Sequence, residues 1–301
     1  MTNWLVTIVG PTAIGKTALA IELAKHFKTE ILSGDSRQFY KEMSIGTAVP
    51  SAKELEAAPH HFIQHLSIED NYSVGHFEKD TIALLKNIFE KQPLAILVGG
   101  SGMYVDAVIN GLDEFPRVKP VIRDELNKLY TSNGLGALHK LLEQKDPIYY
   151  NKVDLQNHQR IIRALEVCIS SGKPFSSFQQ KKKPPRNFNV IKIGLNADRA
   201  ILYDRINKRV DHMITVGLVE EVKNLLPRKR LNALQTVGYR ELFAHFESEY
   251  TLKEAIEKIK TNTRRFAKRQ LTWYRKDEDI KWFDFQTNVT EIIEFIKTKT
   301  S

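Results

Sequence analysis

A glycine-rich motif with a lysine and a threonine lies near the N-terminus, at Gly10-Pro11-Thr12-Ala13-Ile14-Gly15-Lys16-Thr17. The pattern is G-x-x-x-x-G-K-T, between an apolar run at 5–9 and a helix-forming run at 18–24, which is the context of a phosphate-binding P-loop. The two glycines allow backbone turns in which successive N–H groups face one anion. Lys16 adds positive charge, and the Thr17 hydroxyl suits Mg²⁺. We therefore expect a polyphosphate and Mg²⁺ to bind here.

Two further apolar runs end in residues that bear on the chemistry. Residues 29–33 read as a strand and are followed by Asp35. Ligands of open parallel sheets gather at the carboxyl ends of the strands, so we expect Asp35 close to the P-loop. The run 93–98 ends in glycines, at a place where an ATP-hydrolysing enzyme of this class carries a magnesium-binding aspartate. Simple ATP hydrolysis is therefore disfavoured.

The elements that position these residues change in character along the chain. Short apolar runs alternate with helical patterns over 1–116, which is typical of a parallel sheet covered by helices. The pattern is helical over 117–188, and a strand resumes within 189–301. We predict a P-loop NTPase-like α/β core with helices on both faces, interrupted by a helical insertion at 117–188.

Positive charge is concentrated in a few segments. The net charge is +9. A polar basic loop is expected at 179–186, and a basic helix at 252–276 carries like charges four residues apart, a repulsion worth a few tenths of a kcal/mol. These pairs are Arg264 with Lys268 and Arg265 with Arg269. A phosphate backbone would relieve the repulsion, so nucleic acid is the first expected partner, with a merely solvated face as the alternative.

Composition restricts the class of protein. The one cysteine, Cys168, excludes an internal disulfide framework, and its place on the apolar side of a helical run favours a core role. We find no secretory signal and no apolar run near the ~18 residues of a membrane span. We expect a cytoplasmic monomer without a membrane partner.

His60, His61 and His65 form a cluster in the sequence. Either a metal site or polar packing in a loop would explain them, and we favour packing.

The motifs together resemble those of the tRNA dimethylallyltransferases, also called tRNA isopentenyltransferases, of the bacterial type. The resemblance covers most of the chain. Besides the P-loop it rests on Asp35-Ser36-Arg37-Gln38-Phe39-Tyr40, Ile45-Gly46-Thr47-Ala48-Val49-Pro50, Pro59-His60-His61, Val98-Gly99-Gly100-Ser101-Gly102-Met103-Tyr104, residues 157–166, Gln235-Thr236-Val237-Gly238-Tyr239-Arg240 and Arg269-Gln270-Leu271-Thr272-Trp273. Many relatives carry Thr where Ser101 stands, which keeps the hydroxyl.

The resemblance implies transfer of a dimethylallyl group from dimethylallyl diphosphate to the exocyclic N6 of the adenosine just 3′ of the anticodon. The P-loop would then hold a diphosphate leaving group. The amine must lose a proton as the C–N bond forms, and Asp35 is the candidate general base. Lys16, loop amides, Mg²⁺ held by Thr17, and Arg209, which matches the family's catalytic arginine, would stabilise the leaving group.

The target base must leave its stack, and the resemblance implies a tunnel in which the base and the diphosphate meet from opposite ends. It also places tRNA contacts at Asp35, Ser36, Arg37, Gln38, Ser101, Arg123, Gln159, Arg160, Ile161, Ile162, Arg163, Gln235, Thr236, Val237, Gly238, Tyr239 and Arg240. In a helix over 155–171, Arg160 and Arg163 are expected to point away from the apolar side, so the insertion would clamp the anticodon arm.

Three other functions remain open at this point. An isopentenyltransferase acting on free adenine nucleotides would need little of the insertion or of the basic helix. A small-molecule kinase with a P-loop would consume ATP without tRNA. An RNA-binding protein with a vestigial phosphate site would bind tRNA whether or not Lys16 is present.

Overall fold

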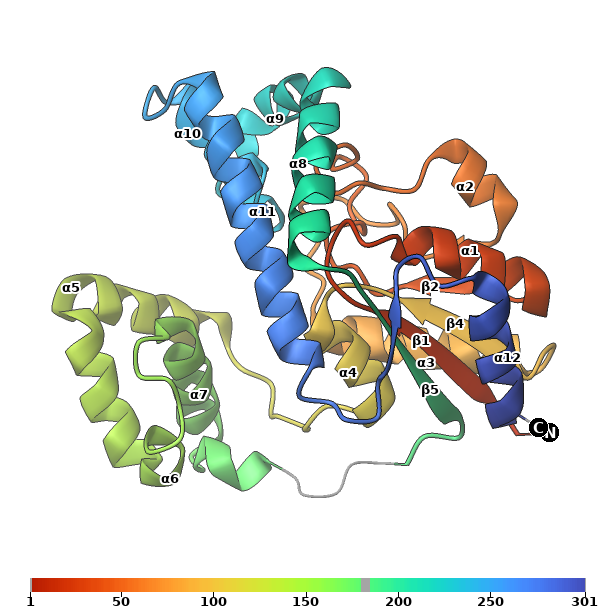
Figure 1. Cartoon of the computed structure of the whole chain (residues 1–301). Coiled ribbons are helices and arrows are strands. Elements are labelled where there is room, and N and C mark those ends of the chain that lie inside the picture. The colour runs from red at the N-terminus through yellow and green to blue at the C-terminus, as the bar shows by residue number, and fades with distance from the viewer. Residues whose placement is uncertain (1, 180–184, 301) are drawn as a thin grey trace. The chain divides into compact units, whose positions relative to one another are not determined.

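The computed structural model describes residues 2–179 and 185–300 (Figure 1). It contains two compact units, and we describe each by itself. One consists of Met1–Asn110 with Arg186–Ser301, and the other of Gly111–Pro185. Residues 180–184 of the expected basic loop lie outside the described residues. In the described ranges, no helix is long and apolar enough to cross a bilayer.

The larger unit is built on a parallel sheet. The described strands form one six-stranded sheet in the order β3-β2-β4-β1-β5-β6. They are β1 (Trp4–Val9), β2 (Ile31–Ser33), β3 (His60–His61), β4 (Leu94–Val98), β5 (Asn189–Asn196) and β6 (Lys281–Asp284). Strand β1 lies in the middle, pairing with β4 on one side and β5 on the other. Because all pairs are parallel, the segments that follow β1, β2 and β4 emerge at one edge of the sheet.

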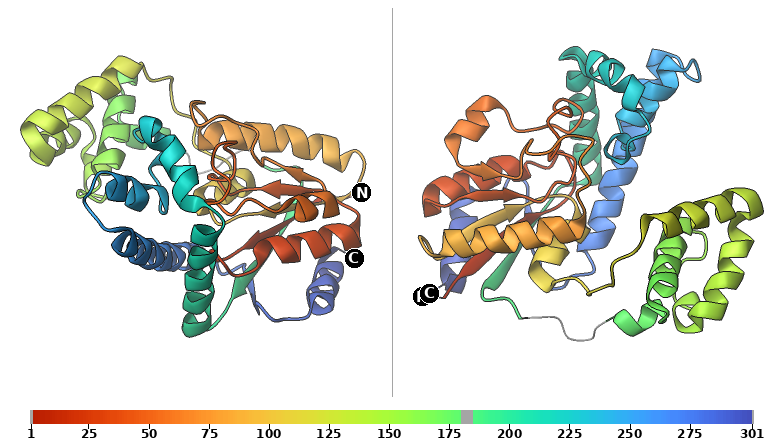
Figure 2. Two further views of the ribbon diagram at one scale, coloured as in Figure 1. Left: turned by 90° about the horizontal axis from the view of Figure 1, so that it is seen from above. Right: turned by 180° about the vertical axis from the view of Figure 1, so that it is seen from behind.

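Helices cover both faces of this sheet, as the sequence predicts (Figure 2). They are α1 (Lys16–Phe27), α2 (Ala52–Ala57), α3 (Val74–Phe89), α4 (Gly102–Asn110), α8 (Arg199–Thr215), α9 (Leu218–Leu225), α10 (Tyr239–Phe246), α11 (Leu252–Tyr274) and α12 (Val289–Thr300). Side chains alternate along the strands, so Leu5 and Leu97 pack with α3 and α4. Ile8 and Ile96 pack on the other face with α1 and α12.

Local sequence signals account for the ends of several of these helices. Ser73 precedes the amphipathic run 74–89, a sequence pattern that predicts a helix cap there, and its hydroxyl accepts a hydrogen bond from the backbone N–H of His76, which confirms it. Thr251 caps α11 with Glu254 in the same way. Gly10 has φ 138°, and a Cβ there would lie 2.5 Å from the carbonyl oxygen of Leu195. The first P-loop glycine is therefore required both by conformation and by close contact with β5.

The smaller unit is helical and has its own core. It contains α5 (Pro120–Lys145), α6 (Pro147–Tyr150), α7 (His158–Ser171) and a 3-10 turn at Phe175–Phe178. Helix α5 is interrupted at Gly134, whose φ is 73° and ψ −173°. Leu138, Leu142 and Leu165 are fully buried in its core. Cys168 is buried in the same core, as expected, and burial raises the pKa of its thiol.

Candidate active site

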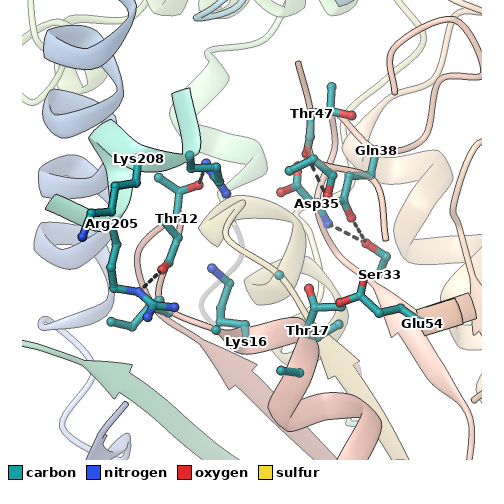
Figure 3. Close-up of a pocket in the computed structure, with 18 residues that line it drawn as sticks. Thr12, Lys16, Thr17, Ser33, Asp35, Gln38, Thr47, Glu54, Arg205 and Lys208 are labelled. Carbon is teal, nitrogen blue, oxygen red and sulfur yellow. Dashed lines mark hydrogen bonds between the residues drawn. The ribbon is translucent and has the colours of Figure 1, made fainter. Parts of the chain in front are cut away.

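The P-loop follows β1 and opens α1, in the predicted strand–loop–helix arrangement. It lines a cavity of about 480 Å³, which we call the phosphate-loop cavity (Figure 3). Its lining residues are Thr12, Ala13, Ile14, Gly15, Lys16, Thr17, Ala18, Ser33, Asp35, Gln38, Thr47, Ala48, Glu54, Val98, Gly99, Arg205, Lys208 and Arg209. Gly10 and Pro11 do not line it: Gly10 packs against Leu195, and the Pro11 carbonyl accepts from Lys16. The cavity lies at the carboxyl ends of β1, β2 and β4, where a parallel sheet binds its ligands.

Lys16 is the buried cation of this cavity. Its Nζ donates a hydrogen bond to the carbonyl oxygen of Pro11 at 2.8 Å. Burial lowers the pKa of Lys16 to about 8, although the negative charge of Asp35 acts in the opposite direction, and the charge of Arg209 lowers the pKa further. A buried ammonium with a pKa near neutrality favours an anionic ligand strongly, because the ligand restores the lost stabilisation of the charge.

Arg209 brings a second cation from α8. Its guanidinium donates a hydrogen bond to the hydroxyl of Thr12. Burial lowers the pKa of Arg209, and Asp35 partly offsets this effect. Its Nε is buried and has no hydrogen-bond partner within residues 2–179 and 185–300. An unpaired buried donor on a charged group is costly, which indicates that this site is built for an anion.

Asp35 follows β2 and lines the same cavity as Lys16, which confirms the predicted proximity to the P-loop. Its Oδ1 accepts a hydrogen bond from the backbone N–H of Arg37 at 3.1 Å, which fixes the start of the turn. Strand β4 ends at Val98 and is followed by Gly99, so no carboxylate stands at that strand end. Asp35 and Glu54 both line the cavity, and Asp35 is the carboxylate whose charge acts on Lys16 and Arg209.

A second cavity, of about 590 Å³, is walled on one side by α11, and we call it the α11 cavity. It shares Thr12, Asp35, Thr47 and Arg209 with the phosphate-loop cavity. The two cavities therefore meet at the residues that carry the candidate base and one candidate cation. An anion bound on the P-loop and a group bound in the α11 cavity would approach each other beside Asp35.

The α11 cavity has an aromatic and basic rim. Phe266 and Trp273 line it from α11 and are 38% and 40% exposed, and Met103 lines it from α4 at 53% exposed. The Arg269 guanidinium lies over the Phe266 ring, 5.7 Å from its centroid. Trp273 Nε1 donates to Asp106 at 2.9 Å. Exposed flat rings beside an arginine are the usual surface on which an unstacked nucleobase rests.

Most of the expected tRNA contacts in this unit converge on the α11 cavity. Its lining includes Asp35, Ser36, Arg37, Ser101, Gln235, Thr236, Val237 and Arg240. The Ser101 hydroxyl accepts from the Ser36 backbone N–H at 3.2 Å, and Arg37 donates to the Ala233 carbonyl at 2.9 Å, so these side chains also hold the cavity wall together. Gln38 lines the phosphate-loop cavity and donates to the Ala48 carbonyl at 2.9 Å.

Tyr239 and Gly238 are buried and do not lie on the surface. Tyr239 is fully buried, and its hydroxyl donates to Glu221 at 2.7 Å. The same Glu221 carboxylate accepts three backbone N–H groups, from residues 44–46. Gly238 precedes α10 with φ 97°. The motif 235–240 therefore combines cavity residues with a core tyrosine, because the burial of Tyr239 leaves no side-chain surface for RNA.

In the helical unit, the expected contacts divide in the same way. Gln159 and Arg160 are exposed, whereas Ile161 and Ile162 are core residues. Arg163 is not an isolated surface cation, because its guanidinium contacts Glu166 at 3.4 Å and lies over the Phe115 ring. Arg123 donates to the same carboxylate. The predicted buried side of α7 is confirmed, and an ion-paired cluster occupies part of the opposite side.

His60 and His61 form strand β3 and not the expected loop, whereas His65 lies in the loop that follows, and all three make packing contacts. His60 Nδ1 lies 2.8 Å from the Ala58 carbonyl, and His61 Nε2 lies 2.6 Å from a Glu30 carboxylate oxygen. The His65 ring packs edge-on against Phe39. In the part of the chain that the structure describes, no three His, Cys, Asp or Glu side chains are arranged to hold a metal ion. The favoured interpretation, polar packing, agrees with these contacts.

The sequence interpretation missed several site residues, among them Glu54, Lys208, Phe266 and Trp273, and two of the others make contacts with the P-loop. Arg205 donates from Nε to the Ala13 carbonyl at 2.8 Å and lines the phosphate-loop cavity. Gln270 contacts the P-loop from α11 and is only 6% exposed. A signal for Gln270 existed, because it lies three residues after the buried Ala267 on the apolar face of a basic helix. A polar residue at such a position needs a buried partner.

A parallel α/β sheet with a P-loop, whose cavity meets an aromatic pocket, is typical of a P-loop enzyme that transfers a group from a phosphate ester. The family model "IPP transferase" matches residues 38–277. The chain is 59% identical to the tRNA dimethylallyltransferase of Christiangramia forsetii, over 99% of both chains, and 57% identical to that of Flavobacterium johnsoniae, over 98% and 97%. The chain therefore belongs to the IPP transferase family.

Solved structures agree with this assignment. The tRNA isopentenylpyrophosphate transferase of Bacillus halodurans is 39% identical, with a TM-score of 0.74 and coverage of 99% of this chain and 96% of that one. A eukaryotic dimethylallyltransferase acting on tRNA is 26% identical, with a TM-score of 0.84 and coverage of 99% and 80%. The fold predicted from the sequence is thereby confirmed, and so is the family.

Proposed function

We propose that the protein transfers a dimethylallyl group from dimethylallyl diphosphate to N6 of the adenosine 3′-adjacent to the anticodon of tRNA, and that it releases diphosphate. The observation that carries this proposal is the meeting of two cavities at Asp35, Thr12 and Arg209. One cavity has the cations of a phosphate site, and the other has the aromatic rim of a base site. A reaction between a diphosphate ester and a nucleobase needs both.

The residues of the phosphate-loop cavity fit a magnesium diphosphate. Lys16 is a buried ammonium, and Arg209 keeps a buried Nε without a partner in the described parts of the chain. Thr17 lines the cavity at the first turn of α1, where its hydroxyl would hold Mg²⁺. When bound, Mg²⁺ supplies positive charge to the departing diphosphate. Lys16 and Arg209 stabilise the same charge by hydrogen bonding from fixed positions.

Asp35 is the proposed general base. The C–O bond to diphosphate breaks as N6 attacks the allylic carbon, and the nitrogen then carries an excess proton. The carboxylate of Asp35 accepts that proton, and the electron pair of the broken bond leaves with diphosphate. The position of Asp35 in both cavities supports this role, because the base must reach N6 while the cations face the leaving group.

The α11 cavity would receive the target base after its extrusion from the anticodon loop, with stacking on Phe266 and Trp273. The exposed Gln159 and Arg160 of α7 are proposed to contact the anticodon arm. Because one copy of the chain carries both cavities, we also propose that the enzyme acts as a monomer. Its one cysteine is free and buried, which suits a reducing compartment, and we propose that the enzyme is cytoplasmic.

One experiment separates this function from its competitors. The protein is incubated with Mg²⁺ and dimethylallyl diphosphate, with unmodified tRNA or with AMP as acceptor, and the products are read by nucleoside mass spectrometry. The expected result is N6-dimethylallyl adenosine in the tRNA reaction alone. Prenylated AMP would identify a free-nucleotide transferase. A parallel reaction with ATP in place of the diphosphate would reveal a kinase through a phosphorylated product.

A further inference from the structure

Gln270 joins three segments that are far apart in the sequence. It lies in α11 and is 6% exposed. Its Oε1 accepts a hydrogen bond from the backbone N–H of Thr12 at 2.9 Å, and its Nε2 donates to the carbonyl oxygen of Gly100 at 2.9 Å. One side-chain amide therefore holds the helix, the P-loop and the turn after β4 in a fixed relationship, because a buried amide is costly when either group loses its partner.

The fit at the Gly100 end is close. A Cβ on Gly100 would lie 2.2 Å from Nε2 of Gln270 and 3.8 Å from Nζ of Lys16. A side chain at this position would displace the amide of Gln270. The backbone at Gly100, which Gln270 holds, therefore passes near the buried ammonium of Lys16. The amide lines the α11 cavity, and Thr12, whose N–H it holds, lines the phosphate-loop cavity.

The peptide group between Pro11 and Thr12 connects Gln270 with Lys16. Its N–H is donated to Gln270, and its carbonyl oxygen accepts from Lys16 Nζ at 2.8 Å. Because a peptide group is planar, fixing the N–H direction also fixes the carbonyl that orients Lys16. Thr12 extends the connection, since its hydroxyl accepts from Arg209. The positions of both cations of the phosphate site therefore depend on the one peptide group that Gln270 holds.

We propose that Gln270 is a positioning residue for the diphosphate: it fixes the plane of the Pro11–Thr12 peptide and thereby places the Lys16 ammonium and the Arg209 guanidinium on the leaving group. This inference rests on the proposed function of the phosphate-loop cavity. Helix α11 also presents Phe266 and Trp273 to the α11 cavity. A single helix thus contributes to the positions of both reacting groups, because Phe266, Gln270 and Trp273 share one face of α11.

The first test measures binding of inorganic pyrophosphate with Mg²⁺ by calorimetry. Gln270→Met keeps the length of the side chain but forms neither hydrogen bond. It should weaken pyrophosphate binding by about tenfold, the equivalent of one hydrogen bond, while tRNA affinity stays near the wild-type value. In single-turnover reactions the transfer rate should fall by ~10–100-fold, because the cations lose their alignment.

Asn262→Ala is the matched control. Asn262 also lies on α11 and makes a partly buried polar contact, donating to Glu241 at 2.7 Å, but it lines neither the phosphate-loop cavity nor the α11 cavity. Its loss should lower the thermal stability without changing pyrophosphate affinity. Comparison at a temperature where both variants are folded separates a positioning role from a stabilising one.

Gln270→Glu supplies a second test, in which the same variant is compared at different pH values. An ionised carboxylate accepts from Thr12 but repels the Gly100 carbonyl, whereas a protonated carboxyl can both accept and donate. Burial raises the pKa of such a carboxyl, while the positive charges of Lys16 and Arg209 lower it. The pyrophosphate affinity of Gln270→Glu relative to wild type should therefore recover as the pH is lowered from about 8 to about 5. If Gln270→Met does not fold, this pH series decides the same question.

The outcomes test the phosphate site and the positioning role of Gln270 separately. If the wild type does not bind pyrophosphate, the phosphate site itself is wrong, and the positioning role falls with it. If the wild type binds pyrophosphate, but Gln270→Met binds it as tightly as Asn262→Ala and Gln270→Glu shows no recovery at low pH, Gln270 is a packing residue and the inference alone is wrong.

Discussion

The carboxylate of Asp35 and the ammonium of Lys16 face the same cavity, and the charge of Asp35 raises the pKa of Lys16 against the larger opposing effect of burial. This pairing places a proton acceptor beside a phosphate-binding cation. The two groups reach the cavity from different strands, because the segments after β1 and β2 emerge at one edge of the sheet. Each group leads to a separate prediction.

Diphosphate binding should weaken as the pH rises through about 8. The pKa of Lys16 is lowered to about 8, so the ammonium is fully charged below that pH and neutral above it. Only the charged form attracts the diphosphate, so the affinity is highest on the acidic side. Calorimetry with pyrophosphate from about pH 6.5 to about pH 9.5 measures this dependence.

Lys16→Met provides the control for that titration, because pyrophosphate itself also changes protonation. The component centred near pH 8 should be absent in Lys16→Met. An unchanged pH profile in this variant would assign the dependence to the ligand and not to Lys16.

Asp35→Ala should lower the rate of the chemical step by about 10²–10⁴, the usual contribution of a general base. tRNA affinity should change far less, since the substitution removes one of many groups at the α11 cavity. Single-turnover transfer with saturating tRNA gives the rate, and filter binding gives the affinity. A chemical step near the wild-type rate would remove Asp35 from the mechanism.

tRNA binding should depend steeply on salt, and Arg160 should contribute to that dependence. Arg160 is exposed on α7, whereas Arg163 is engaged with Glu166. Each phosphate contact adds about 0.7–0.9 to the slope of log K against log salt. Arg160→Gln should therefore reduce the slope by about one unit and weaken all substrate tRNAs alike.

Arg199→Gln is the matched control, because Arg199 is exposed on α8, stacks on Tyr203 and lines neither cavity. Its slope should equal that of the wild type. If tRNA binding by the wild type did not change with salt, the basic faces would be only solvated. The proposal that the helical unit clamps RNA would then be wrong.

Tyr239→Phe should act on stability rather than on RNA binding. The Tyr239 hydroxyl is buried and donates to Glu221, so its removal leaves a carboxylate with one donor fewer and should cost about 1–3 kcal/mol of unfolding free energy. Urea unfolding measures this cost. A large loss of tRNA affinity at unchanged stability would instead indicate that the motif 235–240 contacts RNA through this side chain.

The sequence predicts the parts of the molecule that local rules determine. The P-loop and the Ser73 cap depend on neighbours within a few residues, and the placement of Asp35 follows from the parallel order of the strands. The hydrogen-bond partners of Gln270 and Glu221 could not be predicted in this way. Gln270 bonds to a residue 258 positions away, and Glu221 bonds to the 44–46 segment. Such partners are set by tertiary packing, so no local pattern contains them.

The helical unit shows the same limit. The helix pattern identifies the buried side of α7 from Ile161 and Leu165 alone. It does not show that Arg123, from another helix, shares Glu166 with Arg163. A basic residue therefore looks like a free phosphate ligand in the sequence, although in the folded unit it already has a carboxylate partner.

The central claim is that N6 of the adenosine 3′ of the anticodon enters the α11 cavity and reacts beside Asp35. The most direct test is transfer to anticodon stem-loops that differ only at this nucleotide, which carries either adenine or purine, a base without the exocyclic amine. The products are digested and located by mass spectrometry. The account predicts one dimethylallyl group on the adenine stem-loop, at that nucleotide, and none on the purine stem-loop. Transfer to the purine stem-loop, or to another nucleotide of the adenine one, would contradict it.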